Sequence, residues 1–298
     1  MLSKVNSKCL LFLLYKILIY YIILIYGDDS MKTVVITGSA RGLGLEMAKV
    51  FKKNNYNVVI SDLNNDNLKL ACDELNKIES NSKVIYKVCN VVNSEDIIEL
   101  IKYSVNEFES IDIWINNAGI NQPNKAIWEL STDEIETILN VDLKGTIIAS
   151  NLVMKRMIKQ HSGAIYNVEG YGSNNATMLG LSMYGTAKRA ITYFTEALAK
   201  ECETTKNGVI IGKLSPGIMI TDFITNALVN KEKIELDEKT KKVYNILADY
   251  PDTVANFLVN GIINNKKNNA KIDWLPNRKA AWRFMTSAFN KRDFFKDK

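Results

Sequence analysis

The feature that most constrains the fold is the regular alternation, from Met31 onward, of short apolar runs with longer amphipathic stretches. Six apolar runs are short enough for buried strands: residues 34–37, 57–61, 83–88, 111–116, 164–168 and 209–214. Stretches of helical character lie between them, and one, residues 94–108, has Ser94 as its expected N-cap. Strand and helix alternating in this way predict an α/β fold, a single doubly wound domain. Its central parallel sheet should have about seven strands, with helices on both faces.

After Pro216 the alternation weakens, and residues 222–298 predict a mostly helical C-terminal region on the substrate side of the domain. The end of this region is basic and aromatic, so it could contact a membrane surface or cover a hydrophobic substrate. The alternative is a helix that packs Trp282, Met285 and Phe289 on the domain and leaves its basic face in water. We expect the packed helix.

The first thirty residues contain a nearly continuous apolar run, residues 10–26, interrupted by Lys16. Its length lies at the lower edge of what spans a bilayer. Residues 1–30 are therefore a membrane anchor, a cleaved signal peptide, or an extension created by a misassigned start. A signal peptide is the weakest interpretation because no small-x-small cleavage pattern follows the run. Met31 stands directly before the first strand, so we expect the catalytic domain to be residues 31–298.

The composition excludes several classes of function. A chain of 298 residues that is 47% hydrophobic can bury a full core, and its net charge of +5 is too dilute for a nucleic-acid partner. His161 is the only histidine, which disfavours Ser-His-Asp hydrolysis and His-ligated metals. The four cysteines lack CxxC spacing, so we expect no metal site and no disulfide framework. This favours a reducing, cytoplasmic location, membrane-anchored if residues 10–26 are retained.

A glycine-rich turn follows the first strand, in the segment VVITGSARGLGLEMAKVF. Glycines permit a tight turn and close approach of the backbone to a pyrophosphate, and the helix N-terminus that follows favours an anion. Three glycines alone are a modest signal for dinucleotide binding, and their position between a strand and a helix makes the signal strong. The residues expected to bind a dinucleotide here are Gly38, Ser39, Arg41, Gly42, Leu43 and Gly44.

The second strand ends at Asp62, about twenty residues beyond the glycine turn. A carboxylate at this position accepts hydrogen bonds from the adenosine ribose and repels a 2′-phosphate, which favours NAD. Arg41 is the counter-argument, since a guanidinium near the same ribose could pair with the 2′-phosphate of NADP. NAD is therefore the preferred cofactor, and NADP stays possible.

Polar residues also follow the third and fourth strands. Asn90 and Val91 could meet the adenine edge, and Asn117, Ala118 and Gly119 combine small residues with an amide that can tie loops together. The alternative for each asparagine is local loop capping.

Tyr184 and Lys188 are four residues apart in an amphipathic stretch, so a helix places both side chains on one face. An ammonium near a phenol stabilises the phenolate, and we expect the pKa of Tyr184 to fall toward the working range. Tyr184 could then exchange a proton with the oxygen of a carbonyl/alcohol pair, and Lys188 could also hold the nicotinamide ribose.

Together, TGSARGLG, NNAG, YGTAK and LSPGIMITD resemble the motifs of the short-chain dehydrogenase/reductase family, in order over residues 31–222. The resemblance implies a Rossmann fold, a small carbonyl or alcohol substrate and a homo-oligomer. It also implies that Pro216, Gly217, Ile218 and Thr221 border the nicotinamide.

Two departures from the family pattern concern the chemistry. The family usually has Asn at the position of Asp142 in this chain. In the family, that Asn supports a proton-relay water. The family's catalytic Ser is replaced by Gly170, and Ser173 is the nearest hydroxyl that could polarise the carbonyl; a neutral loop Ser is the alternative.

The segment NVEGYGSNN is similar to the chlorophyll(ide) b reductase-like subgroup, which implies reduction of a formyl group to hydroxymethyl. That subgroup resembles NADP users, whereas Asp62 indicates NAD. We therefore predict an NAD(P)-dependent oxidoreductase acting on a carbonyl/alcohol pair. The alternative is a catalytically silent dinucleotide-binding protein on the same fold, motivated by Asp142 and the missing Ser.

Overall fold

The computed structural model describes residues 31–221, 236–289 and 292–295. Residues Lys32–Lys298 belong to one compact unit. The apolar run 10–26 lies outside the described residues. Within the ranges that are described, no helix is both long and apolar enough to cross a membrane.

The centre of the domain is a seven-stranded sheet in which every neighbouring pair of strands is parallel. Its strand order is β3-β2-β1-β4-β5-β6-β7. The strands are β1 (Thr33–Thr37), β2 (Asn57–Asp62), β3 (Val84–Val88), β4 (Ile113–Asn116), β5 (Gly163–Val168), β6 (Val209–Ser215) and β7 (Ala270–Asp273). The α/β fold class predicted from the alternation is therefore confirmed. The short seventh strand falls in a region for which the sequence predicted mostly helix.

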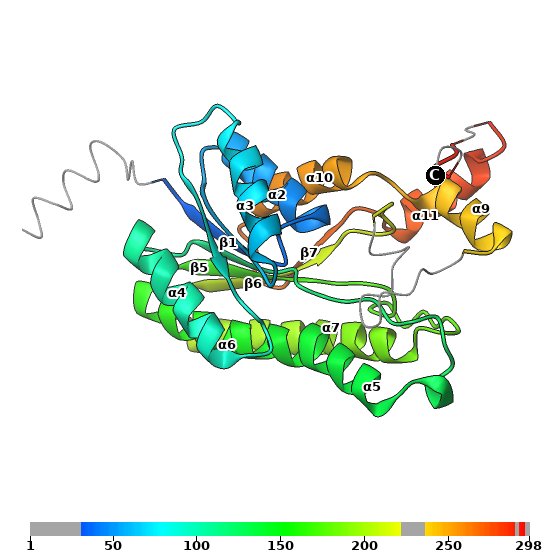
Figure 1. The fold of residues 1–298 in the computed structure, drawn as a ribbon, viewed down its shortest axis with the longest axis horizontal. Helices are drawn as coiled ribbons and strands as arrows, with labels where there is room; N and C mark the ends of the chain where they lie inside the picture. The colour runs from blue at the N-terminus through cyan, green and yellow to red at the C-terminus, as the bar shows by residue number, and fades with distance from the viewer. Residues whose placement is uncertain (1–30, 222–235, 290–291, 296–298) are drawn as a thin grey trace, which may run out of the picture. The chain divides into compact units, whose positions relative to one another are not determined.

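Helices cover both faces of this sheet (Figure 1). The α-helices are α2 (Gly42–Lys53), α3 (Asn65–Asn76), α4 (Ser94–Phe108), α5 (Thr132–Ile138), α6 (Thr146–Gln160), α7 (Ser182–Thr205), α9 (Glu238–Leu247), α10 (Pro251–Asn264) and α11 (Asn277–Thr286). A 3₁₀ turn, η1 (Ile127–Glu129), and a π-helical segment, η2 (Leu139–Gly145), connect them. The strand order reverses between the neighbouring strands β1 and β4, which is the topological switch point of the sheet. Ligands of such folds bind at the carboxyl ends of the strands beside the switch point.

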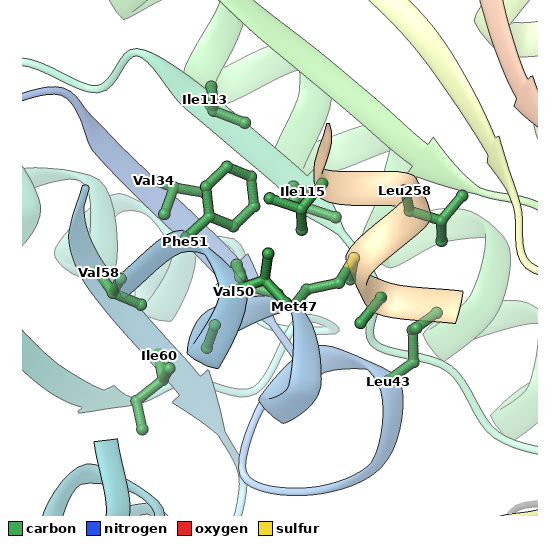
Figure 2. Packing of buried hydrophobic residues seen from close by; sticks show 14 of the residues in the cluster. Val34, Leu43, Met47, Val50, Phe51, Val58, Ile60, Ile113, Ile115 and Leu258 are labelled. Atoms are coloured by element: carbon green, nitrogen blue, oxygen red, sulfur yellow. The ribbon is translucent and has the colours of Figure 1, made fainter. Parts of the chain in front are cut away.

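Two apolar cores hold the layers together. On one face Val34 and Ile36 of β1 pack with α2, α3 and α10, where Met47, Phe51 and Leu258 are fully buried (Figure 2). On the other face Val35 packs with residues of α4, α6 and α7. Successive residues of β1 alternate between the two cores because side chains alternate along a strand, and a strand buried on both faces reads as a continuous apolar run.

The start of α4 differs from the prediction by one residue. The N-cap is Asn93, whose Oδ1 accepts a hydrogen bond from the backbone N–H of Glu95 at 2.9 Å, and Ser94 is the first helical residue. Asn and Ser both cap well, so sequence preference alone could not choose between adjacent candidates.

The expected packing of the C-terminal helix was wrong. Trp282, Met285 and Phe289 are 62%, 69% and 92% exposed. The side of α11 that faces the domain carries Lys279 and Arg283, and polar contacts hold it there. The apolar side chains therefore point away from the core.

Candidate active site

The glycine turn after β1 is packed directly against the loop after β4. Gly38 has φ +62°, and a Cβ atom there would lie 2.6 Å from the Cα of Ala118. A Cβ on Gly44 would lie 2.7 Å from Nδ2 of Asn117. That same amide donates to the carbonyls of Thr37 (3.0 Å) and Gly38 (2.8 Å). Asn117 thus ties the two loops together, and the contact requires glycine at both positions of the turn.

Gly42 serves a different purpose in the same turn. Its φ is +59°, yet a Cβ atom would meet no described protein atom within 4 Å. The Arg41 side chain makes no capping hydrogen bond to the start of α2, and no acidic residue stands in the first turn. The first N–H groups of a helix lack intrahelical partners and carry partial positive charge. This open, uncapped helix start fits a pyrophosphate.

Asp62 lies beside the turn, at the end of β2. Its Oδ2 accepts from the N–H of Ala40 (3.4 Å) and its Oδ1 from that of Leu63 (2.8 Å). Ser39 is fully buried, and its hydroxyl donates to the carbonyl of Ile36 at 2.6 Å. Asp62 therefore stands where a ribose would follow a pyrophosphate, whereas the hydroxyl of Ser39 shapes the turn from beneath.

The remaining predicted cofactor residues differ in their surroundings. Oδ1 of Asn90 accepts from the N–H of Val92 at 3.1 Å, which is the local loop capping that the sequence left open. Val91 packs against Gly145 of η2, since a Cβ atom on Gly145 would lie 3.0 Å from Cγ2 of Val91. Gly119 is close to Asp142 and Lys188, since a Cβ there would lie 3.3 Å from Oδ1 of Asp142 and 3.4 Å from Nζ of Lys188.

The segment after β6 is irregular and forms an isolated parallel bridge between Met219 and Asp249. Pro216 is buried, Gly217 has φ +69°, and the carbonyl of Ile218 accepts from the N–H of Asp249 at 3.1 Å. Thr221 is the last residue that the structure describes before residues 222–235, which lie outside the described ranges. The segment is thus fixed to the start of α10 through Asp249.

The catalytic candidates are buried on α7. Tyr184 and Lys188 lie one helical turn apart, and Nζ of Lys188 is 5.4 Å from the centroid of the Tyr184 ring. Nζ of Lys188 also lies 3.4 Å from Oδ2 of Asp142. The three residues therefore form one buried cluster, which helical spacing alone predicted only for the first two.

Asp142 enters this cluster from η2 and is fully buried. Its Oδ1 accepts from the N–H of Ile120 at 2.7 Å, so the carboxyl group also fixes the loop after β4. Burial raises the pKa of Asp142, while Lys188 and the Ile120 N–H act in the opposite direction. An amide at this position would keep one acceptor but would leave Lys188 without its counter-ion.

The pKa of Tyr184 changes in the direction opposite to the sequence-based expectation. Burial raises it, and the negative charge of Asp142 raises it further. The ammonium of Lys188 lies 3.4 Å from Oδ2 of Asp142 and is paired with that carboxyl group. The raised pKa favours the protonated form of the phenol.

Gly170 explains why the usual catalytic Ser is missing. A Cβ atom at this position would overlap the hydroxyl oxygen of Tyr184 and lie 3.0 Å from Cγ of Lys188. Ser173 is buried, accepts from the N–H of Gly170 at 3.2 Å and donates to the carbonyl of Lys188 at 3.2 Å. In this arrangement the Ser173 proton is directed to the backbone of α7 and supports the Tyr184 helix.

Sequence reasoning missed Gln122, which is fully buried. Its Oε1 accepts from the N–H groups of Met183 (2.8 Å) and Tyr184 (3.1 Å). The N-cap of α7, Leu181, has no side chain that can do this. Gln122 therefore caps α7 from 62 residues away in the chain, and no local pattern indicates it.

Glu169 is a second buried charge beside the site. Its Oε1 accepts from the hydroxyl of Thr192 at 2.9 Å, and its Oε2 lies 3.2 Å from Nζ of Lys271 on β7. The acidic residue was visible in NVEGYGS, but its partners are distant in sequence. It links the end of β5 to α7 and to the edge strand.

A parallel sheet with a glycine turn at its switch point, next to a buried Tyr–Lys pair, defines an α/β oxidoreductase of the dinucleotide-binding class. The chain belongs to the short-chain dehydrogenase/reductase family, since residues 32–232 match the family model for short chain dehydrogenase. The family that the motifs indicated is therefore confirmed.

Proteins similar in sequence to this chain include two chloroplastic proteins of Arabidopsis thaliana. A probable chlorophyll(ide) b reductase is 32% identical over 244 residues, which are 76% of this chain and 47% of the relative. Another chlorophyll(ide) b reductase is 32% identical over 233 residues, 77% of this chain and 64% of the relative. A diacetyl reductase of Staphylococcus epidermidis is 28% identical over 208 residues, 70% of this chain and 78% of the relative. The chain thus spans about half to two thirds of the plant proteins.

Solved structures with the same fold include levodione reductase, with a TM-score of 0.73 and 20% identity over 84% of this chain and 98% of that one. A metagenomic short-chain oxidoreductase in complex with NADP has a TM-score of 0.65 and 16% identity, covering 81% of this chain and 95% of that one. At these identities the likeness shows the shared fold.

Proposed function

We propose that this protein reduces a carbonyl group, a formyl group above all, with a nicotinamide dinucleotide as the hydride donor. The observation that carries the proposal is the buried cluster of Tyr184, Lys188 and Asp142. It adjoins Gly119, in the loop that packs on the glycine turn, so catalytic and cofactor-binding groups share one edge of the sheet.

The cofactor would lie along that edge. The uncapped start of α2 and the open position at Gly42 suit the pyrophosphate, and Asp62 suits the adenosine ribose. Lys188 would hold the nicotinamide ribose, and the segment Pro216–Thr221 would border the nicotinamide ring. We propose NAD as the preferred cofactor because Asp62 repels a 2′-phosphate, with NADP as the alternative through Arg41.

The chemistry assigned to the protein is proton transfer. A bound reduced nicotinamide would supply the hydride to the carbonyl carbon. The Tyr184 hydroxyl would donate its proton to the carbonyl oxygen, and Tyr184 would regain a proton from solvent. A raised pKa favours the protonated phenol, which is the form that a reductase needs before hydride transfer.

Lys188 and Asp142 would govern the charge around the phenol. When Tyr184 loses its proton, the phenolate needs a positive neighbour, and Lys188 can supply one because Asp142 can take up a proton. The raised pKa of Asp142 supports this role. Ser173 would act by positioning α7, and a hydroxyl that turns toward the carbonyl is the alternative.

A formyl substrate is supported by the similarity to two chlorophyll(ide) b reductases. We further propose that residues 1–30 lie outside the catalytic domain and that the protein is a homo-oligomer.

The second candidate function is a silent dinucleotide-binding protein. Asp142 favours it, since a carboxylate that neutralises Lys188 removes the charge that activates the phenol. Retention of both Tyr184 and Lys188 argues against it, because binding alone requires only the glycine turn.

The test is a fluorescence titration of the full chain with NADH and NADPH, followed by turnover on aldehydes, ketones and formyl-bearing tetrapyrroles. Tighter binding of NADH with turnover of a formyl substrate supports the proposal. Binding without turnover on the whole panel selects the silent protein, and failure to bind either dinucleotide contradicts both.

A further inference from the structure

The segment Pro216–Thr221 follows β6 at the carboxyl edge of the sheet, where ligands of parallel α/β folds bind. Among these described residues, none belongs to a helix or to the seven-stranded sheet, and Met219 forms only an isolated bridge with Asp249. The N–H of Asp249 donates to the carbonyl of Ile218, and its carbonyl accepts from the N–H of Ile220, both at 3.1 Å. The backbone of Asp249 therefore holds the segment from both sides of the bridge.

Three hydrogen bonds in turn fix the side chain of Asp249, of which only 13% is exposed. Oδ2 accepts from Nη1 of Arg283 at 2.6 Å and from the indole N–H of Trp274 at 2.7 Å. Oδ1 accepts from Nη1 of Arg292 at 3.1 Å. Hydrogen bonds in which a partner is ionised are about twice as strong as neutral ones, so this carboxylate is held in one orientation.

Both arginines also bind the end of α9. Arg283 donates to the carbonyl of Leu247 at 2.8 Å. Arg292 donates to the carbonyls of Ile246 and Ala248. The last carbonyls of a helix lack intrahelical partners and carry partial negative charge, which the two guanidinium groups satisfy. Arg283 belongs to α11 and Arg292 follows it, so the C-terminal part of the chain fixes the position at which α9 ends.

A second contact joins the segment to the residues between β7 and α11. A Cβ atom on Gly217 would lie 2.9 Å from Cβ of Leu275 and 3.7 Å from Cδ1 of Trp274. The backbone N–H of Trp274 donates to the carbonyl of Ser215 at 2.9 Å. Trp274 thus contacts the start of the segment and, through its indole N–H, the carboxylate of Asp249. One continuous network therefore runs from α11 to the segment after β6.

We propose that Asp249 is a positioning residue for the nicotinamide, held in place by Arg283 and Arg292. The proposal rests on the proposed function, in which the segment Pro216–Thr221 borders the nicotinamide ring. Asp249 acts through this segment and not by contact with the reacting atoms. All three residues lie beyond residues 32–232, the part of the chain that matches the family model. The C-terminal part of this chain is therefore required for the geometry of hydride transfer.

The first experiment compares the two ends of the dinucleotide. Asp249→Asn keeps the shape of the side chain and removes the charge that pairs with both arginines. ADP-ribose lacks the nicotinamide ring, and its proposed ligands Gly42 and Asp62 lie after β1 and at the end of β2, on the other side of the switch point. The dissociation constant of ADP-ribose should therefore stay unchanged in the variant.

Hydride transfer should respond differently, because the reacting atoms must be aligned closely. A misplacement of about 1 Å can cost about 10²-fold in rate. In a single turnover of the full chain with NADH and a formyl-bearing tetrapyrrole, we expect Asp249→Asn to lower the rate constant of hydride transfer by about 10- to 10²-fold.

The second experiment needs neither substrate nor cofactor. Amide hydrogen exchange in the peptide that contains Ile218 and Ile220 should be faster in Asp249→Asn, because the segment opens more readily. Arg292→Ala removes one of the two cations and should give a smaller change in the same direction. Arg278→Ala, which removes an exposed cation from the start of α11, is the matched control and should change neither exchange nor hydride transfer.

Three results would overturn the proposal. Unchanged exchange of the segment in Asp249→Asn and Arg292→Ala would mean that this network does not hold it. Faster exchange with unchanged hydride transfer would leave Asp249 a structural role alone, and so would an equal loss of affinity for ADP-ribose and NADH. Arg292→Ala decides the same points if Asp249→Asn does not fold. Absence of NADH binding by the unsubstituted chain is a different failure, because it contradicts the proposed function and with it any role of Asp249 in the reaction.

Discussion

The two halves of the site are built by different means. In the proposed cofactor half, around Gly38 and Gly44, the glycine turn packs on the backbone of Ala118 and on the neutral amide of Asn117. In the catalytic half, around Tyr184, Lys188 and Asp142, three ionisable side chains are buried together. The first half should therefore be sensitive to added volume and the second to changed charge.

The largest effect is expected from Tyr184→Phe, which removes the proton donor and keeps the ring. General acid catalysis contributes about 10²- to 10⁴-fold, so kcat should fall by about that factor. The dissociation constant of the dinucleotide should stay unchanged, because the glycine turn is untouched. Comparable loss of affinity and of kcat would mean that the two halves are not separable.

Gly38→Ala should have the next largest effect, and it should act on binding. The added Cβ meets the backbone of Ala118, and the left-handed φ is strained for Ala. Overpacking typically costs about 1–3 kcal/mol and the strain about 1–2 kcal/mol more. We expect a lower free energy of unfolding in urea and weaker dinucleotide binding.

Gly42→Ala is the matched control for that prediction. It has nearly the same φ but no described atom within reach of the new methyl group, so only the strain of about 1–2 kcal/mol should appear. Equal destabilisation in the two variants would show that the contact with Ala118 is unimportant.

Asp142→Asn should shift the pH dependence of alcohol oxidation, for which Tyr184 must be ionised. Ionised Asp142 raises the pKa of Tyr184, and loss of that charge also frees the positive charge of Lys188. Both changes lower the pKa of the phenol. The rise of kcat/KM with increasing pH should therefore occur at lower pH in the variant, and an unchanged profile would contradict the ion pair.

The smallest effect is expected from Gln122→Met, which has similar volume but cannot accept the N–H groups of Met183 and Tyr184. Loss of a helix cap costs about 1 kcal/mol, and kcat should fall by a small factor with little change in KM. Gln122→Glu, as the neutral acid, keeps the acceptor and a donor for the carbonyl of Lys125, so kcat should be restored at pH values at which the new carboxyl group is protonated. A fall in Gln122→Glu as large as in Gln122→Met would argue against capping.

The same contrast explains how much the sequence could predict. Alternation predicted the sheet, and local spacing placed Tyr184 and Lys188 on one helix, because both are short-range patterns. The Asp142–Lys188 pair, the cap from Gln122 and the clash at Gly170 are contacts between residues that are distant in the chain. β7 is four residues long and carries too little pattern to distinguish it from the helices around it.

The outward orientation of the apolar side chains of α11 was also unpredictable, for a physical reason. Its periodicity is that of any amphipathic helix, and apolar periodicity normally indicates burial. Only the contacts of Arg283 and Lys279 determine which side faces the domain. The polar ends of two long side chains determine the orientation of α11, and such contacts leave no periodic pattern in the sequence.

The most direct test of the central claim is to follow the hydride. Reduced nicotinamide dinucleotide with both hydrogens at C4 replaced by deuterium would be incubated with the full chain and a formyl-bearing tetrapyrrole, and the mass of the alcohol product would be measured. The account predicts one deuterium on the new hydroxymethyl carbon, with product formation nearly abolished in Tyr184→Phe. Product without deuterium, or equal product from Tyr184→Phe, would contradict it.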